Sequence, residues 1–316
     1  MRAFLLSVLC LVLLAGCRHK ELCYDHPHVM EVNVIFDWCK APEASPQSMS
    51  LYLFPESGRR VERYEFAGCK GGRIRVNPGR YRAICLNSDT RNIRIRDNGS
   101  FTDFRLTTDD TELHATASLM GVRAGSPPRA RNTEDERIAQ SPDEVWTGNI
   151  GELAVDESAA DIILTPEKSF IRFNIEVYNA ENLEFAYIIS GALTTLSGGY
   201  LPGTDTLSEE NVTIPFETTF SEADHCIKGG FLTFGHCPTI EFRHFLTLYA
   251  SMDDGTDISF RFDVTEQIHN APDPENIVIV LDGLELPEPG NNGGGSSGGL
   301  KPDVGEWTSV DIGLKM

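Results

Sequence analysis

Runs of residues in which apolar and polar side chains alternate constrain the fold of this chain more than any other feature. The run Met30–Trp38 has an apolar residue at every second position, and the run Ile171–Val177 repeats the pattern. A period of two predicts a strand that buries one face and exposes the other. Turn signals such as Asn77-Pro78-Gly79 and Asp254-Gly255 separate these runs, and no convincing amphipathic helix accompanies them. The sequence therefore predicts an all-β protein.

The spacing of the predicted strands indicates two tandem β-sandwich domains. Short strands that recur about every 8–12 residues are typical of sandwiches and barrels. At about 150 residues per domain, a length of 316 residues also suggests two. We expect the first domain at residues 29–166 and the second at residues 167–289, with Pro166 at the boundary. Residues 121–145 are dominated by Gly, Pro, Arg and Glu and predict an exposed excursion from the first domain.

The last residues predict a strand that is separated from the second domain. Residues 290–306 are glycine-rich, which predicts a flexible linker, and residues 307–316 alternate again. A lone strand is not stable in water, so this strand must add to the edge of a sheet. It either completes its own sandwich or pairs with another subunit, and the sequence leaves both possibilities open. The residues expected to take part in strand exchange are Trp307, Val310, Ile312 and Leu314.

The first residues predict an export signal. Arg2 precedes the mostly apolar segment Ala3–Leu14, whose helix would be only about 18 Å long, too short for a bilayer core of about 30 Å. The segment ends in Leu14-Ala15-Gly16-Cys17, which resembles the bacterial lipobox. That resemblance implies a signal peptide at residues 1–16, cleavage between Gly16 and Cys17, acylation of Cys17, and a tether at residues 17–28. An ordinary signal peptide with an incidental cysteine is the alternative.

The charge balance argues against nucleic acid as a partner. The chain has 27 basic and 47 acidic residues, for a net charge of −20, and removing residues 1–16 takes away one basic residue, which gives −21. Nucleic-acid binding requires basic surface that displaces phosphate counterions. We therefore expect attachment to a membrane through the N-terminal lipid rather than through basic residues.

Six cysteines remain once Cys10 leaves with the signal and Cys17 is acylated. An exported protein meets an oxidising environment, so these six can form disulfides. Their pairing does not follow from the sequence, and all could equally be free core residues. Cys226 and Cys237 flank Gly229-Gly230, which suggests a turn between them and a hairpin that they close. The six are Cys23, Cys39, Cys69, Cys85, Cys226 and Cys237.

Three groups of residues have side chains suited to metal ions, and each has a simpler structural explanation. Residues 24–28 hold two histidines and an aspartate around a proline, which we interpret as the turn into the first strand. His225-Cys226 and His236-Cys237 are too far apart for a zinc knuckle, so we expect a hairpin or a disulfide there. Residues 253–257 lack the later acidic ligand of a calcium loop and predict a hairpin turn. The motifs of esterases, zinc proteases and nucleotide-binding enzymes do not occur, so we expect no enzyme activity and no cofactor.

Several further runs carry a resemblance to a known family. They resemble an uncharacterised family of Bacteroidetes lipoproteins that is related to the fimbrillin-like proteins, and the resemblance covers essentially the whole mature chain. The runs are Leu22–His28, Phe36–Trp38, Ser50–Pro55, Gly79–Arg82, Leu86–Asp89, Ser190–Ala192, Thr233–Pro238 and Phe262–Thr265.

The resemblance implies both a fold and a role. The fold it implies is two transthyretin-like Greek-key β-sandwich domains, held by lipid at the outer membrane and exposed at the cell surface. The role it implies is a non-enzymatic anchor or accessory subunit of a fimbria-like assembly, which pairs with other fimbrial subunits by β-strand addition. A stand-alone surface module that binds glycans or host proteins is the alternative.

Overall fold

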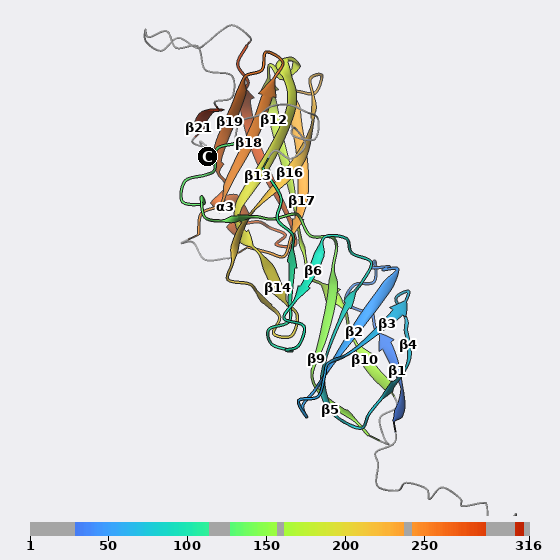
Figure 1. Ribbon diagram of the computed structural model, residues 1–316. Helices are drawn as coiled ribbons and strands as arrows, with labels where there is room; N and C mark the ends of the chain where they lie inside the picture. Colours follow the sequence, from blue (N-terminus) through green and yellow to red (C-terminus); the bar gives the residue numbers. More distant parts are fainter. Residues whose placement is uncertain (1–28, 114–126, 157–160, 237–241, 289–306, 313–316) are drawn as a thin grey trace, which may run out of the picture.

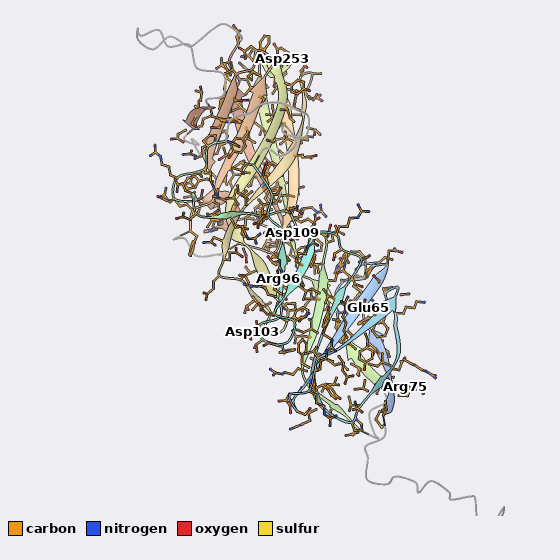
Figure 2. All side chains as sticks on the ribbon, in the orientation of Figure 1. Glu65, Arg75, Arg96, Asp103, Asp109 and Asp253 are labelled. Carbon is orange, nitrogen blue, oxygen red and sulfur yellow. The ribbon has the colours of Figure 1, made fainter. Side chains whose placement is uncertain are left out.

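The molecule is elongated, with a group of strands at each end and a smaller sheet between them (Figure 1). Charged side chains mark its long axis, since Arg75 lies near one end, Asp253 near the other, and Arg96 between them (Figure 2). The computed structural model describes residues 29–113, 127–156, 161–236, 242–288 and 307–312.

Strands make up nearly all of the regular structure. Among the described residues, the helices are the single turn η1 (Leu183–Phe185) and the five-residue α3 (Thr265–His269). Neither is long or apolar enough to cross a membrane. The prediction of an all-β protein is therefore confirmed.

Two sheets enclose one apolar core in the N-terminal part. The first has the order β10 (Asp161–Leu164), β1 (Met30–Phe36), β4 (Gly71–Val76). The second has the order β11 (Glu167–Lys168), β9 (Trp146–Val155), β5 (Gly79–Asn87), β2 (Ser48–Pro55), β3 (Glu62–Ala67). The alternation predicted at the start of the chain is confirmed in β1, where Val32, Val34 and Phe36 are buried. They belong to the same core as Leu51 and Leu53 of β2.

A nine-stranded sheet forms the C-terminal part. Its order is β20 (Asn276–Glu285), β12 (Ile171–Glu181), β17 (Cys226–Thr233), β16 (Asn211–Ser221), β13 (Ala186–Ser197), β18 (Phe245–Met252), β19 (Asp257–Asp263), β21 (Trp307–Ile312), and β8 (Arg137–Ile138) also pairs with β16. The first part of β16 pairs with β13, and its last four residues pair with β17. Side chains from both ends of this order, such as Ile279 of β20 and Phe260 of β19, share one core. The sheet therefore folds over on itself, and β16 joins its two layers.

A four-stranded sheet joins the two parts. It has the order β15 (Thr206–Leu207), β14 (Gly199–Leu201), β7 (Arg105–Thr108), β6 (Ile93–Arg96). The antiparallel pairing of β14 with β7 connects residues on either side of Pro166. An apolar cluster lies in the same region, where Phe54 and Phe104 pack with Tyr200 and Phe234. The two halves that the sequence predicts therefore share both a sheet and a core.

The structure corrects two expectations for individual segments. Residues 121–145 are not simply an exposed excursion, because β8 pairs in parallel with β16 and Ala130, Thr133 and Ala139 are buried; residues 114–126 lie outside the described part. Gly229-Gly230 is not a turn, because both glycines lie within β17 and pair with β12. The polar composition of residues 121–145 gave no sign of a strand whose partner is distant in the sequence. Two adjacent glycines are more typical of a turn than of the interior of a strand.

Candidate functional site

The predicted lipidation site cannot be placed in the structure. Gly16 and Cys17 belong to residues 1–28, which lie outside the described residues, as does Leu314 of the last strand. The described chain begins just before β1, at the opposite end of the molecule from β21 (Figure 1). Attachment to a membrane through Cys17 therefore stays a prediction.

The last strand, β21, lies at one end of the nine-stranded sheet. It pairs in parallel with β19, from Asp257↔Trp307 to Phe262↔Ile312. No further described strand pairs with its outer edge. Of the two arrangements that the sequence leaves open, the structure contains the one in which this strand adds to its own sheet.

Few side chains hold β21 in place. Trp307 packs edge-on against Tyr249 at 5.4 Å between ring centroids, and Ile312 is a half-buried neighbour of the main core. The hydroxyls of Ser309 and Ser259 are 3.0 Å apart, and Asp311 forms a 3.2 Å ion pair with Arg261. Val310 is 39% exposed.

The other end of the same sheet is protected. The side-chain amide of Gln267, in α3, bonds the backbone of the edge strand β20. Its Nε2 donates to the Val280 carbonyl at 3.0 Å, and its Oε1 accepts from the Val280 N–H at 2.8 Å. A side chain that satisfies edge groups in this way blocks the approach of another strand. The β20 end of the sheet is therefore covered at Val280, whereas no described strand covers the outer edge of β21.

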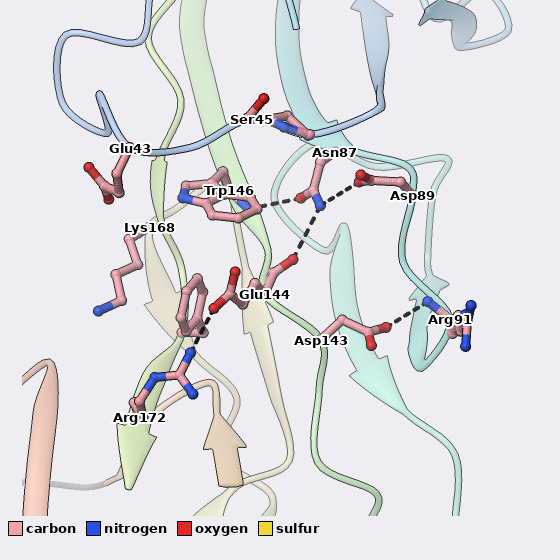
Figure 3. Close-up of a pocket in the computed structure, with 12 residues that line it drawn as sticks. Glu43, Ser45, Asn87, Asp89, Arg91, Asp143, Glu144, Trp146, Lys168 and Arg172 are labelled. Carbon is pink, nitrogen blue, oxygen red and sulfur yellow. Dashed lines mark hydrogen bonds and ion pairs between the residues drawn. The ribbon is translucent and has the colours of Figure 1, made fainter. Parts of the chain in front are cut away.

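A cleft of about 630 Å³ lies where the two halves of the molecule meet. The aromatic rings of Trp146 and Phe170 line it and pack edge-to-face at 5.8 Å. Polar residues from both halves complete the lining (Figure 3). These polar residues are Glu43, Ser45, Asn87, Asp89, Arg91, Asp143, Glu144, Lys168 and Arg172.

Most of the polar groups in this cleft already have structural partners. Asp143 accepts the backbone N–H groups of Arg91 and Asn92, each at 2.6 Å. The Asn87 side-chain oxygen accepts a hydrogen bond from the backbone N–H of Trp146 at 2.9 Å. Arg172 forms a 2.6 Å ion pair with Glu144 that connects the two halves. The carboxylates of Asp143 and Glu144 therefore hold the cleft together, and this arrangement does not resemble an acid–base pair.

The residues singled out as alternative metal sites are separated in the structure. His225 lies at the turn before β17, where its Nδ1 is 3.2 Å from the Ala180 carbonyl. His236 lies elsewhere, beside His244 and His269, and the sequence did not associate these three residues. Asp254-Gly255 forms the predicted hairpin turn between β18 and β19. The group at residues 24–28 lies outside the described residues.

Four of the six remaining cysteines are described, and none of these four is in a disulfide. Cys39 is exposed, Cys69 and Cys226 are half-buried, and Cys85 is fully buried. Burial raises the pKa of the Cys85 thiol to about 12. Cys85 is therefore an apolar core residue rather than a reactive thiol.

Comparison with known proteins identifies the family. Residues 16–217 match the family described as a domain of unknown function, DUF5119. The chain belongs to the DUF5119 family. Over 203 residues it is 26% identical to a protein of Bacteroides ovatus (strain ATCC 8483) that is provisionally named a fimbrium anchoring subunit, Fim4B. The match spans 63% of this chain and 55% of that relative, about half of its length.

Solved structures share the fold of this DUF5119 protein. An adhesin-like protein of Bacteroides ovatus superposes with a TM-score of 0.62 at 24% identity, over 87% of this chain and 98% of that chain. A protein of Bacteroides thetaiotaomicron described as polysaccharide-binding superposes with a TM-score of 0.51 at 10% identity, over 80% of this chain and 91% of that chain. The resemblance inferred from the sequence is confirmed by the family match and by the similarity to Fim4B.

Proposed function

We propose that this protein is a non-enzymatic anchor or accessory subunit of a fimbria-like assembly at the cell surface. The observation that carries the proposal is β21, a sparsely packed strand at the open end of a sheet whose other end is blocked. In this proposal a partner subunit pairs with the edge formed by β19 and β21, either beside β21 or in its place. The name of the Bacteroides ovatus relative, Fim4B, supports this role.

The membrane attachment in this proposal is a lipid on Cys17. The lipobox-like sequence before this residue supports it. Lipidation of such a cysteine adds several acyl chains, which hold a protein to a bilayer far more firmly than one chain does. Cys17→Ala should abolish palmitate labelling and release the protein from the outer-membrane fraction. Labelling that persists in this variant would contradict the anchor.

Two exposed valines provide a matched test of strand addition. Val310 in β21 and Val280 in β20 are 39% and 43% exposed, and they lie at opposite ends of the same sheet. A charge at Val310 should weaken packing of an added strand, because a carboxylate resists burial. We expect Val310→Asp to reduce recovery of partner subunits from native membranes, whereas Val280→Asp should leave it unchanged. Equal recovery with both variants would refute the role of the β21 end.

A second candidate function is glycan binding in the cleft between the halves. The rings of Trp146 and Phe170 next to polar side chains are the observation that favours it, because sugars bind through apolar contacts and hydrogen bonds. The exposed residues Glu43 and Arg91 can be changed without removing the internal bonds of the cleft. If the cleft binds glycans, a glycan array should give hits that are lost in the Glu43→Ala, Arg91→Ala double variant. An array without hits would exclude this candidate.

A further inference from the structure

Three histidines from separate segments meet in the C-terminal part. His236 follows β17 and forms an isolated bridge with Leu196 of β13. His244 immediately precedes β18, and His269 is the last residue of α3. One ring nitrogen of each lies within 4.8 Å of those of the other two.

Each of the three rings packs against the other two, with centroids 5.1–5.6 Å apart. The His236 and His269 rings are stacked at 5.6 Å with an angle of 14° between their planes. The His244 ring is nearly perpendicular to both, at 89° and 81°. Its Nε2 is 3.1 Å from the Nε2 of His269. Two nitrogen ligands of a tetrahedral zinc ion, each about 2.0–2.1 Å from the metal, are separated by about 3.3 Å, which is close to this distance.

Hydrogen bonding directs a lone pair of His244 into the cluster. Its Nδ1 is 3.2 Å from the carbonyl oxygen of Thr194, which can only accept a hydrogen bond. The Nδ1 therefore carries a proton, and in the tautomer with this single proton the Nε2 lone pair is directed at His269. A metal-bound histidine is commonly oriented in this way, through a bond from its other ring nitrogen to a carbonyl.

The surroundings hold His244 firmly. The residue is completely buried, and its backbone N–H donates to the Thr265 hydroxyl at 2.9 Å. Its carbonyl accepts the N–H of Val264 at 3.0 Å. His236 and His269 are only half-buried, so an ion can reach the cluster from solvent. One rigid ligand and two accessible ligands suit reversible binding of a metal ion.

We propose that His236, His244 and His269 form a binding site for a zinc ion. Three imidazoles leave the fourth tetrahedral position for water. The ion ties the start of β18 and the end of α3 to the bridge beside β13. Because Gln267 lies in the same short helix as His269, the ion also fixes the side chain that protects the edge of β20.

The test uses the full-length protein in detergent, stripped with EDTA and titrated with Zn²⁺ against a chromogenic chelator. His269→Gln removes a proposed ligand. His225→Gln is the matched control, because His225 also lies beside a backbone carbonyl but is outside the cluster. We expect one tightly bound zinc ion per chain in the wild type and in His225→Gln. Affinity in His269→Gln should fall by more than about 100-fold, the upper range for loss of an outer-shell partner.

Two controls keep the result decisive. The melting temperature of each variant without metal shows whether it is folded, and zinc should raise the melting temperature of the wild type but not of His269→Gln. Hydrogen exchange at the Val280 amide should slow when zinc is added to the wild type. A folded wild type that binds no zinc, or equal binding by His269→Gln, would overturn the proposal and leave a hydrogen-bonded histidine cluster. Loss of binding in His225→Gln would instead place the ion at His225-Cys226 and equally overturn it.

Discussion

Removing β21 should cost the folded protein little stability. In a variant that ends at residue 306, the lost apolar burial comes mainly from the half-buried Trp307 and Ile312, and each contributes about half of the roughly 1.5–3 kcal/mol of a fully buried side chain. The backbone ladder and the Ser259–Ser309 contact add about 1 kcal/mol per bond. Ordering six residues opposes these gains by about 1–2 kcal/mol per residue. The opposing contributions nearly cancel, so the net loss should be below about 2 kcal/mol.

Urea denaturation measures this loss directly. A change of about 2 kcal/mol lowers the melting temperature by about 4–8 °C for a domain of this size, and the slope of the urea transition should hardly change. Ile279→Ala, in the completely buried core position of β20, is the positive control and should cost about 2–5 kcal/mol. A truncated protein that is unfolded at 25 °C, or that loses more than Ile279→Ala, would refute the reasoning. In that case β21 would be an integral strand of its own sandwich rather than an exchangeable one.

Three further predictions concern the interior. In the native protein at pH 8, a maleimide should label Cys39 but not Cys85, because burial raises the pKa of the Cys85 thiol to about 12. Mass spectrometry measures the labelling, and equal rates at the two cysteines would contradict this prediction. Burial likewise raises the pKa of Tyr249 from 10.0 to about 12, so the stability that comes from its bound proton is complete below pH 10 and is lost as the pH rises through 12. Urea midpoints between pH 9 and 12 should therefore fall less steeply in Tyr249→Phe, and an unchanged slope would count against the assignment. Gly203→Ala places a methyl carbon 1.9 Å from a backbone oxygen at the joint between the halves, so it should lower the free energy of unfolding, measured in urea, by about 1–3 kcal/mol. Gly151→Ala is the control, because its methyl group meets nothing within 4 Å. Equal stabilities of the two variants would show that the joint can relax.

Strands with a regular alternation were predictable from the sequence. In β12, the apolar residues Phe173, Ile175 and Val177 face the core at every second position, as the period of two requires. In the N-terminal part, β9 gives no such signal, although it lies inside its sheet between β11 and β5. One reason is Gly148, where a Cβ would lie 2.9 Å from the Thr165 carbonyl and 3.2 Å from the Cys85 sulfur. Close packing at this position requires the residue that contributes least to a hydrophobic pattern.

Features that depend on contacts between distant segments were not predictable. The pairing of Leu106 with Tyr200 joins the two halves, and no local pattern near either residue indicates it. The histidine cluster is a similar case, since its members are spread over residues 236–269 and none belongs to a ligand motif. His236 attracted attention only through its neighbour Cys237, whereas its structural partners are His244 and His269. Tertiary structure, rather than spacing along the chain, brings these groups together.

The shared joint determines how the molecule responds to mechanical load. The chain passes between the N-terminal and C-terminal cores before β8, after β8 and again between β11 and β12, so any pull along the long axis is divided among several covalent connections. The pairing of β14 with β7 and the apolar cluster of Phe104 and Tyr200 add non-covalent contacts to these connections. Two domains joined by a single flexible linker would separate under small forces. This protein should instead stay rigid under tension until the contacts between β14 and β7 break.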